Sequence, residues 1–422
     1  SAVALIDDPN ERAQLLALNL RGGMRAKSAS ALATAVTLLR HGKALLAADS
    51  WQVNPEQTLL LYCELAEAEY LAGGFEQAEA LYPEGVAAAP GAIAKVTLCL
   101  VQVDQYLITG RFADSLPVLR QALELLGRAF PASDAEAAAL FPAEFAATEA
   151  KLASRVAAEL LPAPEMQAPE VLLAMRVHLG VSYAAYQIGR FNTFVLNASR
   201  MVQATLDHGQ CDLTPVAYVA YLTAMSAMKR PYTACHLLGR VALTLAEQRE
   251  NKYFRLTVYQ YFSAFYQHWG ESLQATLPFL DRGVEFGQSG INPLAAGYCV
   301  LLRAVNRFAH GATLDTLHQE CERGLKYLQQ SHQASTEALL VYGVLLPVQA
   351  LRGQTLQATS FDTPTTSSTD FFKGDYATPS IPLAFHISAM ARHAYLLDDG
   401  RQWRLCADNL AVVGMCLPDS PA

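Results

Sequence analysis

Residues 58–91, TLLLYCELAEAEYLAGGFEQAEALYPEGVAAAPG, contain the pattern that decides the fold. Leu61, Leu65, Ala68 and Leu71 recur at spacings of four, three and three residues, which is one face of a helix over residues 58–71. Gly73-Gly74 then stops that helix, because glycine readily adopts the left-handed conformation of a helix cap. Phe75 begins a partner helix that Pro90-Gly91 closes. The stretch therefore predicts two helices joined by a tight turn.

The turn signal returns along the chain as glycine next to an aromatic residue, or as a related pair. It stands at Gly73-Gly74-Phe75, Gly110-Arg111-Phe112, Gly189-Arg190-Phe191, Arg230-Pro231-Tyr232, Trp269-Gly270 and His310-Gly311. Successive steps are 37, 79, 41, 40 and 41 residues, and 79 is about twice 40, which predicts a degenerate turn near residue 150. A fixed period of this size indicates stacked helical hairpins. We therefore expect an all-α fold, an α-solenoid with a period of about 40 residues.

One hairpin resembles a tetratricopeptide repeat at nearly that family's spacings. The residues that carry the resemblance are Tyr62, Leu65, Ala66, Gly73, Phe75, Ala78, Tyr82 and Pro90. Small residues let the two helices approach closely, while aromatic residues fill the space towards the next hairpin. The resemblance implies a right-handed superhelix of tetratricopeptide-like hairpins, although the later copies are longer than that family's repeat.

A broader resemblance covers nearly the whole chain. Residues 26–31 (AKSASA), 65–71 (LAEAEYL), 110–112 (GRF), 265–269 (FYQHW), 339–353 and 360–362 are similar to the repeat region of large bacterial signal-transduction ATPases with numerous domains. In that family a protein-kinase-like module and an ATPase often precede the repeats, and GAF and sensor histidine kinase modules often follow. The resemblance implies a non-catalytic sensor or interaction region that couples an ATPase module to an output kinase. We also expect that the chain was cut from a longer protein.

Three alternatives remain open at this point. The chain could be a plain protein-interaction scaffold. It could be the ligand-sensing repeat domain of an ATP-dependent transcription activator, although no basic helix-turn-helix is evident. It could also be an enzyme that uses a groove, which would require clustered acid and base groups.

Composition restricts the partners and the compartment. Of 422 residues, 52% are hydrophobic and 17% charged, and the net charge is −8, with no basic block, so we expect no nucleic-acid binding. The sequence contains no uninterrupted run of 18 apolar residues, so we expect no membrane insertion. Eight cysteines without a CxxC pair indicate buried free thiols in a reducing cytoplasm. The expected partners are a protein, other domains of the same polypeptide, or a small-molecule effector.

Four segments are predicted along the chain. Residues 1–162 form N-terminal tetratricopeptide-like repeats, and residues 163–356 form degenerate helical hairpins after a break at Pro162–Pro169. Residues 357–382 are rich in Thr, Ser and Pro and predict a long loop. Residues 383–422 predict a truncated C-terminal hairpin, with a last helix over residues 401–416.

Several apparent sites do not carry chemistry. Residues 21–28, RGGMRAKS, have Arg21 and Ala26 where a phosphate loop needs glycine, and no strand precedes them. His386 and His393 share a helix face, but no further ligand has the spacing of a metal site. No Ser-His-Asp or Cys-His arrangement is evident. We therefore predict no catalytic residue, no cofactor and no metal, and hence no enzyme.

A binding groove, where one exists, is expected on the inner face of the first helices of the hairpins. The residues assigned to it are Thr257, Gln260, Gln267, His268 and Tyr298. His268-Trp269 follows an aromatic-rich helix and could stack on a ligand. Because Tyr261, Phe265 and His268 recur at helical spacing, packing between repeats is the alternative that we favour.

Overall fold

The computed structural model describes residues 8–153, 157–331, 333–364, 366–367, 381–409, 411 and 413. Among these residues all regular secondary structure is helical, which confirms the all-α prediction, and the only β-type contact is an isolated bridge between Glu165 and Gln210. The chain forms two compact units. Unit 1 comprises residues 1–151 and 164–211, and unit 2 comprises residues 152–163 and 212–422.

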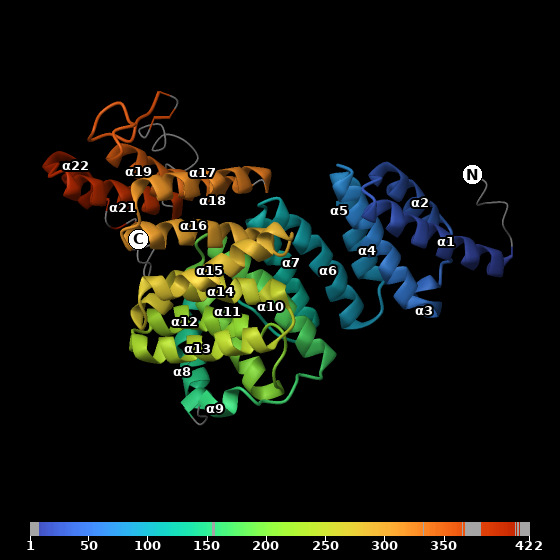
Figure 1. Ribbon diagram of the computed structural model, residues 1–422. Coiled ribbons are helices and arrows are strands. Elements are labelled where there is room, and N and C mark those ends of the chain that lie inside the picture. The colour runs from blue at the N-terminus through green and yellow to red at the C-terminus, as the bar shows by residue number, and fades with distance from the viewer. Residues whose placement is uncertain are drawn as a thin grey trace. The chain divides into compact units, whose positions relative to one another are not determined.

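Unit 1 is built from short-turn helical hairpins. Its helices are α1 (Pro9–Ser28), α2 (Leu32–Ala44), α3 (Ser50–Val53), α4 (Pro55–Leu71), α5 (Phe75–Ala88), α6 (Gly91–Ile108), α7 (Phe112–Leu125), α8 (Asp134–Ala153), α10 (Pro169–Gln187) and α11 (Phe191–His208). The pairs α1–α2, α4–α5, α6–α7 and α10–α11 each pack against one another (Figure 1). Leu61, Leu65 and Leu81 belong to the buried core shared by the first two pairs.

The glycine turns lie where the sequence placed them. Gly73, Gly110 and Gly189 have φ angles of 84°, 76° and 70°, which side chains with a Cβ rarely adopt, and a helix begins two residues after each. Residue 150, near which a turn was expected, lies inside the long helix α8, which ends at Ala153, and residues 154–156 lie outside the described residues. Asp134, at the start of α8, instead accepts hydrogen bonds from the backbone N–H and hydroxyl of Thr193 on α11, at 2.7 and 2.8 Å.

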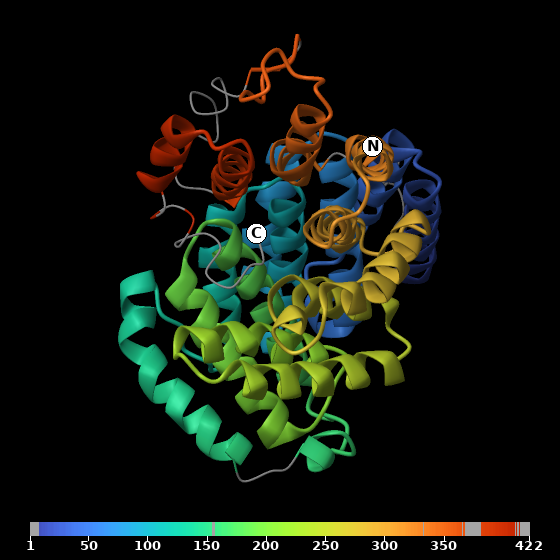
Figure 2. The same cartoon turned by 60° about the vertical axis from the view of Figure 1, so that its left-hand side comes forward.

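Unit 2 continues the hairpin pattern. Its helices are α9 (Ala157–Leu160), α12 (Thr214–Ala227), α13 (Tyr232–Gln248), α14 (Lys252–Phe265), the 3₁₀ turn η2 (Gln267–Trp269), α15 (Leu273–Gln288), α16 (Pro293–Ala309), α17 (Leu314–Gln330), α18 (Ala334–Leu340), the π-helical turn η3 (Val341–Leu345), α19 (Leu346–Leu351), α21 (Ile381–Leu396) and α22 (Gly400–Ala407). The pairs α12–α13, α14–α15, α16–α17 and α21–α22 pack as hairpins, and the last is drawn in red in Figure 2.

The observed division of the chain differs from the predicted segments. Helices α10 and α11 belong to unit 1, although the sequence suggested a new segment from residue 163, because α10 packs closely on α7. A Cβ on Gly180 would lie 2.8 Å from Leu119. The described part of the predicted loop has no helix over residues 357–364, but α21 already begins at Ile381, before the predicted end of the loop. Residues 368–380 and 414–422 lie outside the described residues.

The phosphate-loop-like stretch at residues 21–28 lies entirely inside α1. A Cβ on Gly23 would lie 2.4 Å from the side chain of Leu39, so this glycine allows α1 and α2 to pack closely. An unbroken helix has no loop of exposed N–H groups around a phosphate. The glycines therefore serve helix packing.

Two helical segments are long and apolar enough to span a bilayer by length and composition. Gly91–Ile108 and Ala334–Leu351 have mean hydropathies of 1.2 and 1.4, and 39% and 61% of these windows is buried inside the fold. Two such helices are weak evidence for a membrane span, because core helices have the same composition.

Candidate functional site

The turn between α14 and α15 departs from the simple hairpin turns elsewhere in the chain. Helix α14 ends at Phe265, and residues Gln267–Trp269 form a separate 3₁₀ turn before α15 begins at Leu273. Gly270 follows this turn, and a Cβ there would lie 2.6 Å from the ring of His236 on α13. Glycine thus lets α13 of the preceding hairpin approach the turn closely.

Glu271 is the centre of a polar cluster at this junction. Its Oε1 lies 3.0 Å from Nε2 of His236 and 3.5 Å from Nη1 of Arg240, and its Oε2 accepts a hydrogen bond of 3.0 Å from Nε2 of Gln267. Partial burial opposes ionisation of Glu271, but the hydrogen bonds from Gln267 and His236 and the positive charge of Arg240 outweigh it and lower the pKa of this carboxyl. The cluster therefore carries a stable carboxylate that joins α13 to the turn.

Gln267 has no exposed surface. Its Nε2 also donates to the carbonyl of Ala275 at 3.2 Å, and its Oε1 accepts from the hydroxyl of Ser263 at 3.2 Å. All of these bonds lie within the turn and its flanking helices. Gln267 was assigned to an open groove, and the structure instead places it inside, where it holds the turn in shape.

Two aromatic side chains lie stacked at the surface of this cluster. The rings of Tyr232 and Trp269 have centroids 4.3 Å apart and an interplanar angle of 11°, and the residues are 39% and 47% exposed. The ring of His268 lies 5.0 Å from that of Trp269. A rigid, exposed aromatic pair supplies contact area at low entropic cost and is typical of binding hot spots. We call the aromatic residues Tyr232, His268 and Trp269, together with the neighbouring cluster of Glu271, Gln267, His236 and Arg240, the turn site.

The other predicted groove residues lie apart from the turn site. Thr257 is ten residues before Gln267, about 15 Å along a helix axis, and its Oγ1 accepts a hydrogen bond of 3.1 Å from Nδ2 of Asn292. Gln260 is half-buried on α14. Tyr298 is half-buried on α16 and packs against the core cluster that contains Leu301. Only Gln267 and His268 of the five predicted residues therefore meet in the turn site.

Four residues of the turn site were missed, namely Tyr232, His236, Arg240 and Glu271. The sequence did contain a signal for Tyr232, because Arg230-Pro231-Tyr232 and Trp269-Gly270 are successive occurrences of the turn signal. Turns that are one repeat apart fall at the same end of a stack of hairpins. These two occurrences could thus have predicted that Tyr232 and Trp269 lie close together.

His386 and His393 on α21 have structural partners. Nε2 of His393 lies 2.7 Å from the carbonyl of Ala358, and Nδ1 of His386 lies 3.5 Å from that of Tyr342. The buried ring of Phe361 lies 5.8 Å from the ring of His386 and 5.0 Å from that of His393. The two histidines therefore hold the segment after α19 against α21. In the part of the chain that the structure describes, no group of three or more His, Cys, Asp or Glu residues could hold a metal ion.

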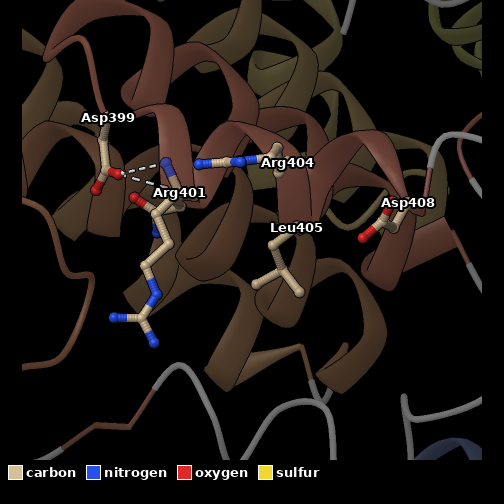
Figure 3. Close-up of a pocket in the computed structure, with 6 residues that line it drawn as sticks. Asp399, Arg401, Arg404, Leu405 and Asp408 are labelled. Atoms are coloured by element: carbon tan, nitrogen blue, oxygen red, sulfur yellow. Dashed lines mark hydrogen bonds between the residues drawn. The ribbon is translucent and has the colours of Figure 1, made fainter.

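A shallow depression lies along α22 (Figure 3). It is lined by Asp399, Arg401, Gln402, Arg404, Leu405 and Asp408. The carboxylate of Asp399 accepts hydrogen bonds of 3.1 Å from the backbone N–H groups of Arg401 and Gln402, so it caps the helix (Figure 3). The depression is open and its best-placed acid is engaged in this cap, which does not favour acid–base chemistry there.

No protein-family model matches the chain, and a search of curated proteins finds no significant match.

Proposed function

We propose that this chain is the helical-repeat sensor or interaction region of a multidomain bacterial signal-transduction protein. In this proposal it is non-catalytic and cytoplasmic, and it couples an ATPase module to an output kinase through contacts with a protein partner, with other domains, or with an effector. It neither binds nucleic acid nor inserts into a membrane. The arrangement proposed is a right-handed superhelix of tetratricopeptide-like hairpins with a period of about 40 residues.

Contacts between residues one period apart support the repeat arrangement. In unit 1, Lys27 of α1 pairs with Glu67 of α4 at 2.5 Å, and Lys43 of α2 pairs with Glu84 of α5 at 2.6 Å, over separations of 40 and 41 residues. Each pair joins corresponding helices of successive hairpins.

Unit 2 has backbone-directed contacts at the same separation. Nδ2 of Asn292 donates to the carbonyl of Tyr253 at 3.1 Å, 39 residues away, and Nε2 of Gln333 donates to that of Pro293 at 2.8 Å, 40 residues away. Both bonds join the start of one hairpin's first helix to the start of the next. A regular stack of hairpins accounts for this repetition.

The observation that carries the interaction function is the exposed stack of Tyr232 and Trp269 beside the Glu271 cluster. Trp269 belongs to a turn that the hydrogen bonds of Gln267 hold in shape, so the aromatic pair is pre-organised and a partner does not have to order it on binding. The exposed Lys229 and Arg230 precede Tyr232 in the chain and add positive charge beside the stack. The turn site therefore has the aromatic and basic character of a binding surface, and its carboxylate, Glu271, is engaged by Gln267, His236 and Arg240.

The test compares two tryptophan variants in the natural polypeptide. Trp269→Ala removes half of the stack, and Trp403→Ala is the matched control, because Trp403 is similarly exposed (49%) on α22. The ATPase rate and kinase autophosphorylation are measured with and without cell extract as the source of partner or effector. Trp269→Ala is expected to keep the basal rates and lose the response, whereas Trp403→Ala keeps both.

Other results would contradict the proposal in distinguishable ways. A response that Trp269→Ala leaves unchanged would remove the turn site from the mechanism. A natural polypeptide without ATPase or kinase activity would favour the plain scaffold, and specific DNA binding by it would favour the transcription activator.

A further inference from the structure

Arg392 on α21 is a half-buried cation that has no charged partner among the described residues. Its Nε is inaccessible to solvent and makes no hydrogen bond, and its side chain forms no ion pair with any part of the chain that the structure describes. Its nearest distinctive contact is the ring of Phe308 on α16, whose centroid lies 5.6 Å from the guanidinium carbon. A cation over an aromatic face gains some stabilisation, but less than a buried charge loses on leaving water.

Other arginines of the described chain that bury an unbonded Nε do have a carboxylate. Arg120 lies 3.6 Å from Glu124, Arg249 lies 3.3 Å from Asp212, and Arg303 lies 2.5 Å from Glu320. Arg392 has no such neighbour, and burial alone lowers the pKa of its guanidinium, with no carboxylate raising it. A fold that pairs the comparable arginines and leaves one unpaired has an incomplete charge pair at that position.

The acidic residues just beyond α21 do not complete the pair. Asp399 is the cap of α22 and accepts from two backbone N–H groups. Asp398 adopts a φ angle of 55° in the turn, and its carboxylate does not raise the pKa of Arg392, as a close ion-pair partner would. No acidic residue of the described part of the chain therefore supplies the counter-charge of Arg392.

The geometry limits how an anion can approach. Because Nε is enclosed, the edge of the guanidinium that an anion can approach is the fork formed by the two Nη atoms, for which no hydrogen bond to a described residue is found. A planar fork of two donors matches the two oxygens of a carboxylate or phosphate group.

We propose that Arg392 is an effector site for one oxyanion group, a carboxylate or a phosphate, bound end-on by the two Nη atoms above Phe308. This site lies on α21 and is separate from the turn site on α13 and η2. The proposed oxyanion site at Arg392 does not depend on whether the repeat region regulates an ATPase.

The test is a thermal melt of the whole chain with inorganic phosphate or acetate, each against chloride at equal ionic strength. The variants are Arg392→Gln and, as a matched control, Arg323→Gln, because Arg323 is an exposed arginine on α17 that forms no ion pair with a described residue. One or both probes are expected to raise the Tm of the native chain and of Arg323→Gln by a few degrees in a saturable way. Arg392→Gln should show no rise, and its Tm in chloride should equal or exceed that of the native chain. Response to phosphate or acetate alone identifies the oxyanion class.

Two results would overturn the proposal, namely a native chain whose Tm neither probe raises, and a rise of equal size in Arg392→Gln. If Arg392→Gln does not fold, Arg392→Lys keeps the charge and loses the fork. It should weaken the apparent affinity for the effective probe about tenfold. An unchanged affinity in Arg392→Lys would overturn the proposal as well.

Discussion

Mild acid should destabilise unit 1 through the buried histidine of α10. His178 is 3% exposed, and its Nδ1 lies 2.7 Å from Oδ1 of Asn197. The Nδ2 of Asn197 donates to the carbonyl of His178 at 2.8 Å and to the hydroxyl of Ser182 at 2.7 Å. Because the amide of Asn197 is oriented by these two bonds, its oxygen accepts, and the neutral imidazole carries its proton on Nδ1.

The size of the effect follows from the pKa of this imidazole. Burial, with smaller contributions from the charges of Arg200 and Arg128, lowers the pKa of His178 to about 4 and outweighs the opposing hydrogen bond to Asn197. The unfolded chain has a histidine pKa of about 6.5. Since the folded state prefers the neutral form, this contribution is intact above pH 6.5 and is lost as the pH falls towards 4. Linkage gives a loss of about 2 kcal/mol at pH 5.

The assay measures the free energy of unfolding of unit 1 at pH 7 and pH 5 by urea titration. Replacing Trp269 and Trp403 with Phe leaves Trp51, which is buried in unit 1, as the fluorescent probe of that unit. The variant His178→Asn keeps a donor near the position of Nδ1 but does not titrate. The parent is expected to lose about 2 kcal/mol more than His178→Asn between the two pH values.

The control is His41→Asn, at an exposed position on α2 of the same unit, which should keep the pH dependence of the parent. A pH dependence in His178→Asn within about 0.5 kcal/mol of the parent would refute the reasoning. It would mean that the folded unit accommodates the imidazolium without the penalty that burial imposes.

Three further predictions concern packing and burial. Glu320→Gln should lower the free energy of unfolding of unit 2 by about 3 kcal/mol, because the buried Glu320 is the counter-charge of Arg303 and Arg307, at 2.5 and 3.0 Å. The control is Asp315→Asn, which breaks the exposed pair with Arg352 and should cost less than about 1 kcal/mol in the same urea titration. Gly239→Ala should destabilise unit 2 by about 1–2 kcal/mol in a thermal melt, since its Cβ would lie 2.2 Å from the ring of Phe262. The control is Gly400→Ala, whose Cβ would meet no atom within 4 Å and which should not destabilise the unit. The seven cysteines of the described chain are buried, and burial raises the pKa of Cys99 to about 11 and of Cys321 to about 12. A thiol-counting reagent at pH 8 should therefore react with these seven only after urea is added. Fast labelling of any of them in the native chain would contradict their burial.

The helices and their turns were predictable because the decisive signals are local. Gly73, Gly110 and Gly189 sit at left-handed turn positions, and each aromatic residue that follows begins a helix. The sequence did not predict how helix α8 attaches to α11, because this attachment depends on hydrogen bonds between Asp134 and residues almost sixty positions later. The sequence contains no local sign of that contact.

The turn site was only half predictable, for a related reason. Gln267 was assigned with Gln260 to the inner, groove-lining face of one continuous helix, but α14 ends at Phe265 and a 3₁₀ turn follows. A 3₁₀ turn advances about 120° per residue where an α-helix advances about 100°, so the side chain of Gln267 rotates into the interior of the fold. The contacts of Glu271 with His236 and Arg240 depend on how one hairpin is positioned against the next, which the periodicity of a single helix does not determine.

The polar contacts between hairpins restrict how the proposed sensor could work. An apolar interface between hairpins allows small sliding and rotation, since dispersion and hydrophobic burial are non-directional. The bidentate pair of Arg40 with the buried Glu69, at 2.5 and 2.8 Å, and the bond of Asn292 to Tyr253 are directional and fix the position of one hairpin against the next. A hairpin held in this way must move with its neighbour or break the bond. Within each unit, a signal received at one hairpin would then pass on as a concerted rotation of several hairpins, and a variant such as Asn292→Ala should weaken the response while leaving binding at the turn site intact.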